Sequence, residues 1–245
     1  AALEAGVIDV NNTFTCTGKH KFGDRTYHCW KKEGHGRVEL LTALAQSCDI
    51  YFYKISEKVG IDKIAEMAKL FGLGEAHDIG LMGQARGLIP TREWKRKTKG
   101  ERWQIGETLN VGIGQGAVLT TPLQLAVMTA RFANGGKAVK PRLVHSIGGI
   151  IEPVEFFPDI PINRRNLAIV LEGMKRVMEP GGVAYGSRLR GEGLSMAGKT
   201  GTAQVVRITQ LQRDEGLEKL RERPWKERDH AIFVGFGSVE DPKYA

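Results

Sequence analysis

The residues best suited to chemistry are a lysine and two threonines in the run 193–202, GLSMAGKTGT. This run fits the pattern G-x-x-x-x-G-K-[ST], the loop with which nucleotide hydrolases hold phosphate. Such a loop joins a buried apolar strand to a helix, whose N-terminus helps to bind the phosphate. Residues 186–193 are too polar for a buried strand, and residues 200–206 favour a strand over a helix. We therefore reject the nucleotide-binding interpretation.

Within the same run, Lys199-Thr200-Gly201 matches the K-T-G element of penicillin-binding proteins and serine β-lactamases, which lies on a strand. Alternation along a strand places the hydroxyls of Thr200 and Thr202 on one face, where they can bind an anion, and Lys199 on the other. Gly201 has no side chain, so another backbone or a substrate can approach it closely. The alternative to a catalytic role is that Lys199 lies in an ordinary surface strand, as holds for many isolated K-T-G sequences.

A second candidate motif is Ser47-Cys48-Asp49, which lies between an amphipathic segment and the apolar run 50–53. It has the form of the S-x-N or S-D-N element that accompanies K-T-G, with aspartate in third place. An ionised carboxylate only accepts hydrogen bonds, whereas an amide also donates them. Asp49 has a simpler alternative role, as the N-cap of the following helix.

Two longer strings add specificity. Residues 110–116 read NVGIGQG and residues 87–95 read GLIPTREWK. With these strings and the two short motifs, the chain resembles class B penicillin-binding proteins of the elongation type, the penicillin-binding protein 2 group, over residues 1–244. The resemblance implies a single transpeptidase domain over residues 1–245. Its α+β fold would be like that of serine β-lactamases, with an antiparallel sheet flanked by helices and a mainly helical lobe.

The same resemblance implies a peptidoglycan D,D-transpeptidase of cell-wall elongation, which crosslinks stem peptides through a serine acyl-enzyme and is inhibited by β-lactams. The implied catalytic residues are Ser47, Asp49 and Lys199, and the implied substrate-binding residues are Thr200, Gly201 and Thr202, the last also through its backbone N–H in an oxyanion hole. Gln115 is interpreted as structural or cleft-lining. The implied partners are a membrane glycan polymerase and other elongation-complex proteins, at the periplasmic face of the bacterial inner membrane.

The family's nucleophile belongs to an S-x-x-K motif, and no serine in these 245 residues has a lysine three positions later. We expect that motif upstream of Ala1, with the domain truncated at both ends and the membrane anchor absent, so that this fragment alone is inactive. The alternatives are a penicillin sensor or β-lactamase-like protein, and a noncatalytic scaffold.

All three cysteines lie in the first 48 residues, and they suggest a second kind of site. Three thiolates and one imidazole can complete a closed tetrahedral zinc site, for which the candidates are Cys16, Cys29, His35 and Cys48. The alternative is a Cys16 to Cys29 disulfide in an oxidising periplasm. Either would staple the loop 11–36, which has too few apolar residues to become ordered by burial. Zinc would also position Ser47, the neighbour of Cys48. No cofactor is expected for catalysis.

Composition is compatible with one domain. The chain is 41% hydrophobic, enough for a sizeable core, and contains no run of 18 apolar residues. Its formal net charge is +8. No nucleic-acid motif accompanies the basic run 95–99, so we expect a solvated loop there and no nucleic-acid partner. An anionic envelope polymer or membrane surface is the alternative partner.

Periodicity predicts the elements that must position these groups. Helical patterns cover 38–59, with a break near Ser47, and 62–71, 122–133 and 164–178; strand patterns cover 194–208 and 231–238. Residues 209–229 are strongly charged, and we expect a surface excursion. Thr121 is the predicted N-cap of the third helical pattern, with Pro122 as its first residue, Gln124 as its capping-box partner and Gly135 near its end.

Overall fold

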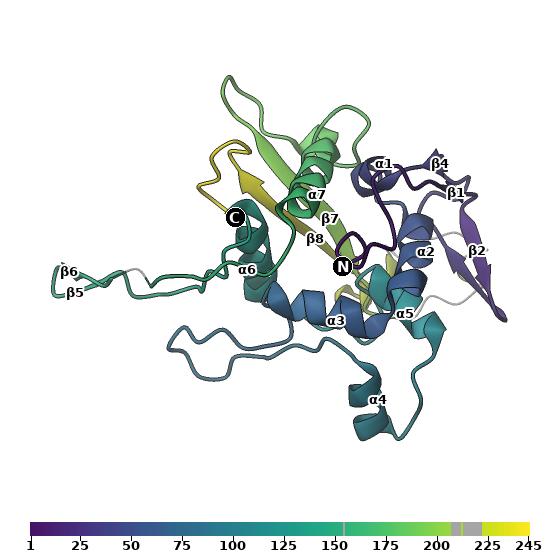
Figure 1. Cartoon of the computed structure of the whole chain (residues 1–245), viewed down its shortest axis with the longest axis horizontal. Coiled ribbons are helices and arrows are strands. Elements are labelled where there is room, and N and C mark those ends of the chain that lie inside the picture. The colour runs from purple at the N-terminus through teal and green to yellow at the C-terminus, as the bar shows by residue number, and fades with distance from the viewer. Residues whose placement is uncertain (154, 207–211, 213–221) are drawn as a thin grey trace.

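The computed structural model of the chain describes residues 1–153, 155–206, 212 and 222–245 (Figure 1). The helices are α1 (Leu40–Ala45), α2 (Asp49–Val59), α3 (Ile61–Leu70), α4 (Arg92–Lys99), α5 (Ile105–Gly112), α6 (Pro122–Ala133) and α7 (Arg164–Val177). The strands are β1 (Phe14–Cys16), β2 (Lys19–Phe22), β3 (Arg25–His28), β4 (Gly36–Val38), β5 (Ser146–Ile147), β6 (Ile150–Ile151), β7 (Met196–Ala203) and β8 (His230–Gly237). The predicted α+β class is confirmed, because packed helices accompany small antiparallel sheets.

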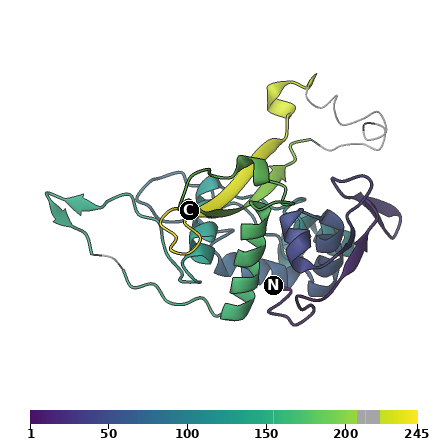
Figure 2. The ribbon, with the colours of Figure 1, turned by 90° about the horizontal axis from the view of Figure 1, so that it is seen from above.

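The longest strands, β7 and β8, form an antiparallel pair in which Lys199 lies opposite Val234 and Thr202 opposite Ala231. Helix α7 packs against β7, and α6 packs against β8. Figure 2 shows α7 between this strand pair and the N-terminal part of the chain. Met174 of α7 is buried with Ala197 of β7 and Phe236 of β8. The strand pair and its covering helices therefore hold the K-T-G residues in a fixed place.

The second part of the core surrounds α2. Ile50 and Tyr51 are almost fully buried there, and they cluster with Leu109 of α5. The helices α2 and α5 pack along each other. The predicted break in the helical pattern is confirmed, since α1 ends at Ala45 and α2 begins at Asp49. The break places Ser47 on a turn between two packed helices, and Val38 belongs to β4 instead.

The predicted start of α6 is also confirmed. Thr121 accepts a hydrogen bond from the backbone N–H of Gln124 at 3.1 Å, and its own N–H donates to the Gln124 side chain at 3.0 Å. Pro122 is the first helical residue, and the helix ends at Ala133, next to the C-cap Asn134. These interactions lie within a few residues of one another, so sequence alone specifies them.

The prediction that residues 95–99 form a solvated loop is wrong. They form most of α4, which Thr91 caps by accepting from Trp94 N–H at 3.0 Å. Gly100 ends the helix in a left-handed conformation, with φ of 69°. Lys95 is not solvated either, because its ammonium pairs with Glu107 at 2.7 Å and Glu101 at 3.1 Å. Charge alone suggested a loop, whereas the caps and the Glu93–Lys97 pair, four positions apart, favour a helix.

Two further predictions differ in extent. The predicted loop 11–36 is not without regular structure, because it contains the hairpin β2–β3, in which Lys19 lies opposite His28. The predicted strand 194–208 is shorter in the structure, where β7 ends at Ala203. Most of the predicted excursion 209–229 lies outside the described residues. In the described parts of the chain, no helix is both long and apolar enough to cross a membrane.

Candidate active site and metal cluster

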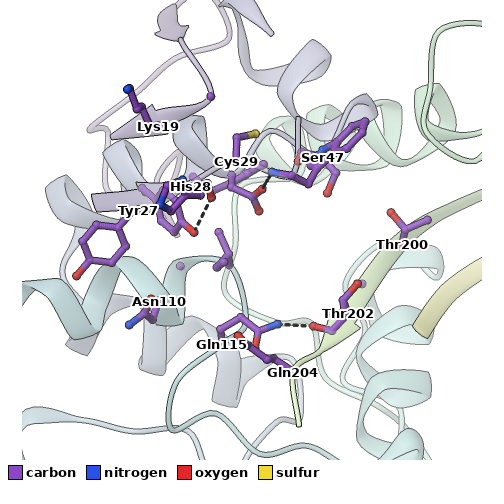
Figure 3. Close-up of a pocket in the computed structure, with 18 of the residues that line it drawn as sticks. Lys19, Tyr27, His28, Cys29, Ser47, Asn110, Gln115, Thr200, Thr202 and Gln204 are labelled. Carbon is purple, nitrogen blue, oxygen red and sulfur yellow. Dashed lines mark hydrogen bonds between the residues drawn. The ribbon is translucent and has the colours of Figure 1, made fainter. Parts of the chain in front are cut away.

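A large cleft lies where the N-terminal loop, the α1–α2 turn, the loop after α5 and the strand β7 meet (Figure 3). Its lining includes all six residues implied for catalysis and substrate binding: Ser47, Asp49, Lys199, Thr200, Gly201 and Thr202. These residues come from two segments about 150 positions apart in the chain. The fold therefore brings the Ser47 motif and the K-T-G motif to one cleft.

Ser47 has a backbone conformation that is uncommon for a residue with a side chain, with φ of 52°. The N–H groups of Ser47 and Cys48 bond to the carbonyls of Leu44, at 3.3 Å, and Ala43, at 2.9 Å. These bonds end α1 and turn the chain sharply into α2. The turn directs the Ser47 hydroxyl toward β7.

Lys199 connects the two motifs. Its ammonium donates to Ser47 Oγ at 2.8 Å and to the Thr200 carbonyl oxygen at 3.1 Å. Burial lowers the pKa of Lys199 to about 8, although the nearby Asp49 carboxylate raises it. An amine with this pKa exchanges protons readily near neutral pH and lies in contact with a hydroxyl, so the pair can move a proton.

Trp30 stabilises the Ser47 turn through hydrogen bonds to its backbone. The sequence analysis did not identify this residue. Its indole N–H donates to the carbonyl oxygens of Gln46, at 3.0 Å, and Ser47, at 2.9 Å. Its backbone N–H donates to Asp49 Oδ2 at 2.9 Å. Burial raises the pKa of Asp49 to about 7, while the Trp30 hydrogen bond acts in the opposite direction. The position of Trp30 directly after Cys29 was the only signal in the sequence.

Asp49 does not cap α2 with its side chain. The N-cap of that helix is Cys48, and Asp49 is the first helical residue. Its carboxylate is engaged by Trp30 at the edge of the cleft. The alternative role as an N-cap is therefore wrong, and the carboxylate is available to the cleft as a hydrogen-bond acceptor.

Thr200 and Thr202 present backbone groups along the edge of β7 that faces the cleft. The Thr200 carbonyl accepts from Lys199, and the Thr202 carbonyl accepts from the side-chain amide of Gln115 (Figure 3). In an antiparallel pair, the N–H and C=O of such alternate residues point away from the partner strand together. Thr202 therefore also directs its N–H into the cleft. The side chain of Gln115 lines the cleft, as the sequence suggested.

The three cysteines and His35 form a compact cluster beside the cleft. Their ligand atoms all lie within 4.8 Å of one another. His35 Nδ1 is 3.6 Å from Cys16 Sγ and 3.5 Å from Cys29 Sγ. A tetrahedral zinc site with ordinary bond lengths places sulfur and nitrogen ligands about 3.6 Å apart. The donor set and its spacing therefore fit zinc, and none of the three cysteines forms a disulfide in this structure.

Close backbone packing shapes this cluster. A Cβ atom on Gly34 would lie 2.2 Å from the Cys16 carbonyl oxygen, and one on Gly18 would lie 1.8 Å from the Lys32 carbonyl oxygen. Both glycines have positive φ. The hydrogen bond to Cys48 lowers the pKa of Cys29, and this interaction raises the pKa of Cys48. The loop is thus folded tightly enough to hold its donors together, with one thiol already favoured as the thiolate that a metal needs.

Comparisons with known proteins show which proteins the chain resembles. The sequence matches the family described as "Penicillin binding protein transpeptidase domain" over residues 1–245. It is 39% identical over 256 residues to the peptidoglycan D,D-transpeptidase MrdA of Acinetobacter baumannii, covering 99% of this chain and 36% of that protein.

Solved structures show the same likeness. A Pseudomonas aeruginosa PBP2 structure has a TM-score of 0.82 and 36% identity, covering 98% of this chain and 51% of that one. Helicobacter pylori PBP2, in complex with MreC, has a TM-score of 0.81 and 31% identity, covering 99% of this chain and 43% of that one. The chain thus spans about half or less of the length of these relatives.

Proposed function

The chain belongs to the transpeptidase family of penicillin-binding proteins, in its elongation-type class B branch, and we propose that it serves as the peptidoglycan D,D-transpeptidase of cell-wall elongation. The observation that supports this most directly is the 2.8 Å hydrogen bond from Lys199 to Ser47 Oγ. This bond joins the two short motifs of the family in one cleft and places an amine beside a hydroxyl, the two groups that a proton relay needs.

The proposed reaction has two acyl-transfer steps. A serine hydroxyl attacks the carbonyl of the D-Ala-D-Ala bond in a stem peptide, an ester forms, and the terminal D-alanine leaves as an amine that takes up a proton. The amine of a second stem peptide then attacks the ester, so that a crosslink forms and the serine is released. Dividing one difficult amide exchange into two steps lowers the barrier of each.

The residues of this cleft supply the groups around that serine. Ser47 relays the proton to the leaving amine, and Lys199 lowers the energy of that transfer through its contact with Ser47 Oγ. The hydroxyls of Thr200 and Thr202 bind the substrate carboxylate, which Lys199 also attracts. The Thr202 N–H contributes one donor to the oxyanion hole, an interaction typically worth about 3 kcal/mol. Asp49 accepts a hydrogen bond from the substrate.

These 245 residues contain no S-x-x-K motif. We propose that the nucleophile and its lysine belong to a segment outside this sequence and that the 245 residues alone are not acylated. One similar structure is H. pylori PBP2 with MreC, and another, 33% identical, describes polymerization and crosslinking by a peptidoglycan synthase complex. By analogy, we propose that the full-length protein works in an elongation complex beside a glycan polymerase. We place this complex, as part of the same proposal, at the periplasmic face of the inner membrane.

A fluorescent penicillin tests the proposal on the full-length protein. We expect covalent labelling of the wild-type protein, weak labelling of Lys199→Ala and none of the purified 245-residue chain. Lys97→Ala, an exposed lysine of α4, is the control and should label like the wild type. A folded full-length protein that does not label would favour a noncatalytic scaffold. Rapid turnover of penicillin, without stable labelling, would favour a β-lactamase.

We also propose that Cys16, Cys29, His35 and Cys48 hold a structural zinc ion, which would tie the loop 11–36 to the Ser47 turn. The spacing of the four donor atoms supports this. The ion would act only as a crosslink, while Trp30 transmits the position of the loop to Ser47. Metal analysis of protein purified without added zinc, with Cys48→Ser beside it, distinguishes zinc from the Cys16 to Cys29 disulfide. A metal-free, disulfide-bonded protein would contradict the zinc proposal.

A further inference from the structure

The carbonyl oxygen of Thr202 lies on the edge of β7 that faces the cleft, and it is already bonded within the protein. Its donor is the side-chain amide of Gln115, which comes from a different part of the chain (Figure 3). Thr200, two residues earlier on the same edge, has its carbonyl bonded to the Lys199 ammonium. Both open-edge carbonyls beside the reaction centre are therefore occupied in the free protein.

An open strand edge is also where an extended peptide binds. A peptide that adds to such an edge makes main-chain hydrogen bonds, in which its N–H groups donate to the strand's carbonyls. An acyl donor whose reacting carbonyl lies near the Thr202 N–H has its preceding amide N–H within reach of the Thr202 carbonyl, because N–H and C=O of one residue share an edge. Gln115 and the substrate would approach this oxygen from the same open edge of β7, so they compete for the space beside it.

The loop that carries Gln115 has a conformation that places its side chain at the Thr202 carbonyl. The backbone N–H of Gln115 donates to the carbonyl of Asn110, near the end of α5, at 2.9 Å. The flanking Gly114 and Gly116 have φ of 75° and 80°, conformations that favour glycine. The short loop therefore leaves α5 in a tight turn and holds Gln115 across the cleft from Ser47.

We propose that Gln115 is a latch on the open edge of β7: its side-chain amide occupies the Thr202 carbonyl in the free protein, and a backbone N–H of the acyl donor displaces it. This inference rests on the proposed transpeptidase function. An acyl donor that carries an N–H at this position must displace the latch, and its N–H then replaces the hydrogen bond that Gln115 gives up. A ligand without that N–H leaves the latch in place, because displacing Gln115 would leave the Thr202 carbonyl unpaired.

The test uses the full-length protein and two penicillins. One has an amide side chain whose nitrogen bears a hydrogen, and the other is an amidinopenicillin whose side-chain nitrogen bears none. Gln115→Ala removes the competing donor, and Gln115→Glu keeps the size but cannot donate when ionised. For the amide penicillin, we expect both variants to raise the second-order acylation rate constant about three- to tenfold, the effect of one hydrogen bond. The rate constant for the amidinopenicillin should stay within about twofold.

Gln84→Ala, a loop glutamine outside the cleft lining, is the control and should leave both rate constants unchanged. Equal changes for the two penicillins, or slower acylation by the amide penicillin in the variants, would overturn the latch. A second measurement does not depend on any variant folding. In a crystal structure of the wild-type acyl-enzyme with the amide penicillin, we expect Gln115 to have left the Thr202 carbonyl; an intact contact would also overturn the latch. A wild-type protein that neither penicillin labels would overturn the proposed function itself.

Discussion

The indole nitrogen of Trp30 lies 2.9 Å from the carbonyl oxygen of Ser47 and donates a hydrogen bond to it. Trp30 follows Cys29, a member of the cysteine cluster, and Ser47 is the residue whose hydroxyl contacts Lys199. One side chain thus connects the cysteine-rich loop to the proposed proton relay. Because Ser47 has φ of 52°, a conformation that costs energy for a residue with a Cβ atom, this connection stabilises a turn that would otherwise relax.

Replacing Trp30 with phenylalanine keeps an aromatic ring but removes the indole donor. We expect Trp30→Phe to lower the free energy of unfolding by about 1 kcal/mol and to slow acylation by penicillin about tenfold or more, because the Ser47 turn loses its restraint. Urea unfolding and acylation rates of the full-length protein measure the two effects. Trp225→Phe, at an exposed tryptophan, is the control. Equal acylation rates for Trp30→Phe and the wild type would show that Trp30 does not position Ser47.

The pKa of Lys199 predicts a pH dependence of stability. Burial lowers this pKa from 10.5 to about 8, so between these values the unfolded chain binds more protons than the folded one, and the free energy of unfolding rises with pH. The side chain of Lys199→Met does not titrate. Relative to this variant, the free energy of unfolding of the wild type should rise by about 3 kcal/mol between pH 8 and pH 10.5, and should not change below about pH 7. Urea unfolding of both proteins across pH 6 to 10.5 measures this difference. A constant difference would mean that Lys199 keeps its ordinary pKa.

Removal of the proposed zinc ion should destabilise the N-terminal loop. We expect a strong chelator to lower the thermal unfolding temperature by more than about 5 °C, since structural zinc contributes directly to folding free energy. Cys48→Ser should bind less metal and show a smaller response to the chelator. His145→Asn, on an exposed segment away from the cluster, should respond like the wild type. If the chelator did not change the unfolding temperature of the wild type, the result would contradict a structural metal.

The two glycines of the K-T-G region should respond differently to alanine. A Cβ atom on Gly198 would lie 2.4 Å from the Phe233 ring and 2.6 Å from the Val234 carbonyl oxygen, whereas one on Gly201 would meet only Ile232 at 3.7 Å. We expect Gly198→Ala to lower the free energy of unfolding by about 2 kcal/mol or more and Gly201→Ala to change it by less than about 0.5 kcal/mol.

For Gly201→Ala, we expect slower acylation by penicillin despite normal stability, because the added methyl group would narrow the space that an incoming ligand uses. Thermal unfolding and acylation rates of the full-length protein separate the two effects. If Gly201→Ala were acylated as fast as the wild type, Gly201 would have no role in ligand approach.

The sequence by itself determined the features that depend on neighbouring residues. The capping box of Thr121 and Gln124 fixed the start of α6, and the polar break around Ser47 separated α1 from α2, because such signals act within one turn of a helix. The motif residues were identifiable by type and order, and their resemblance indicated the family. The caps of α4 were also present in the sequence, but its high charge suggested a loop.

Only the tertiary structure decided how these groups meet. The contact between Lys199 and Ser47 joins residues 152 positions apart, and it depends on the packing of α7 against β7 and of α2 against α5. The roles of Trp30 and Gln115 follow from bonds to backbone carbonyls, which every residue carries, so no pattern of side chains predicts which carbonyl they reach. Sequence specifies local bonds because their partners are fixed by spacing, whereas the long-range contacts of this cleft exist only once the core has packed.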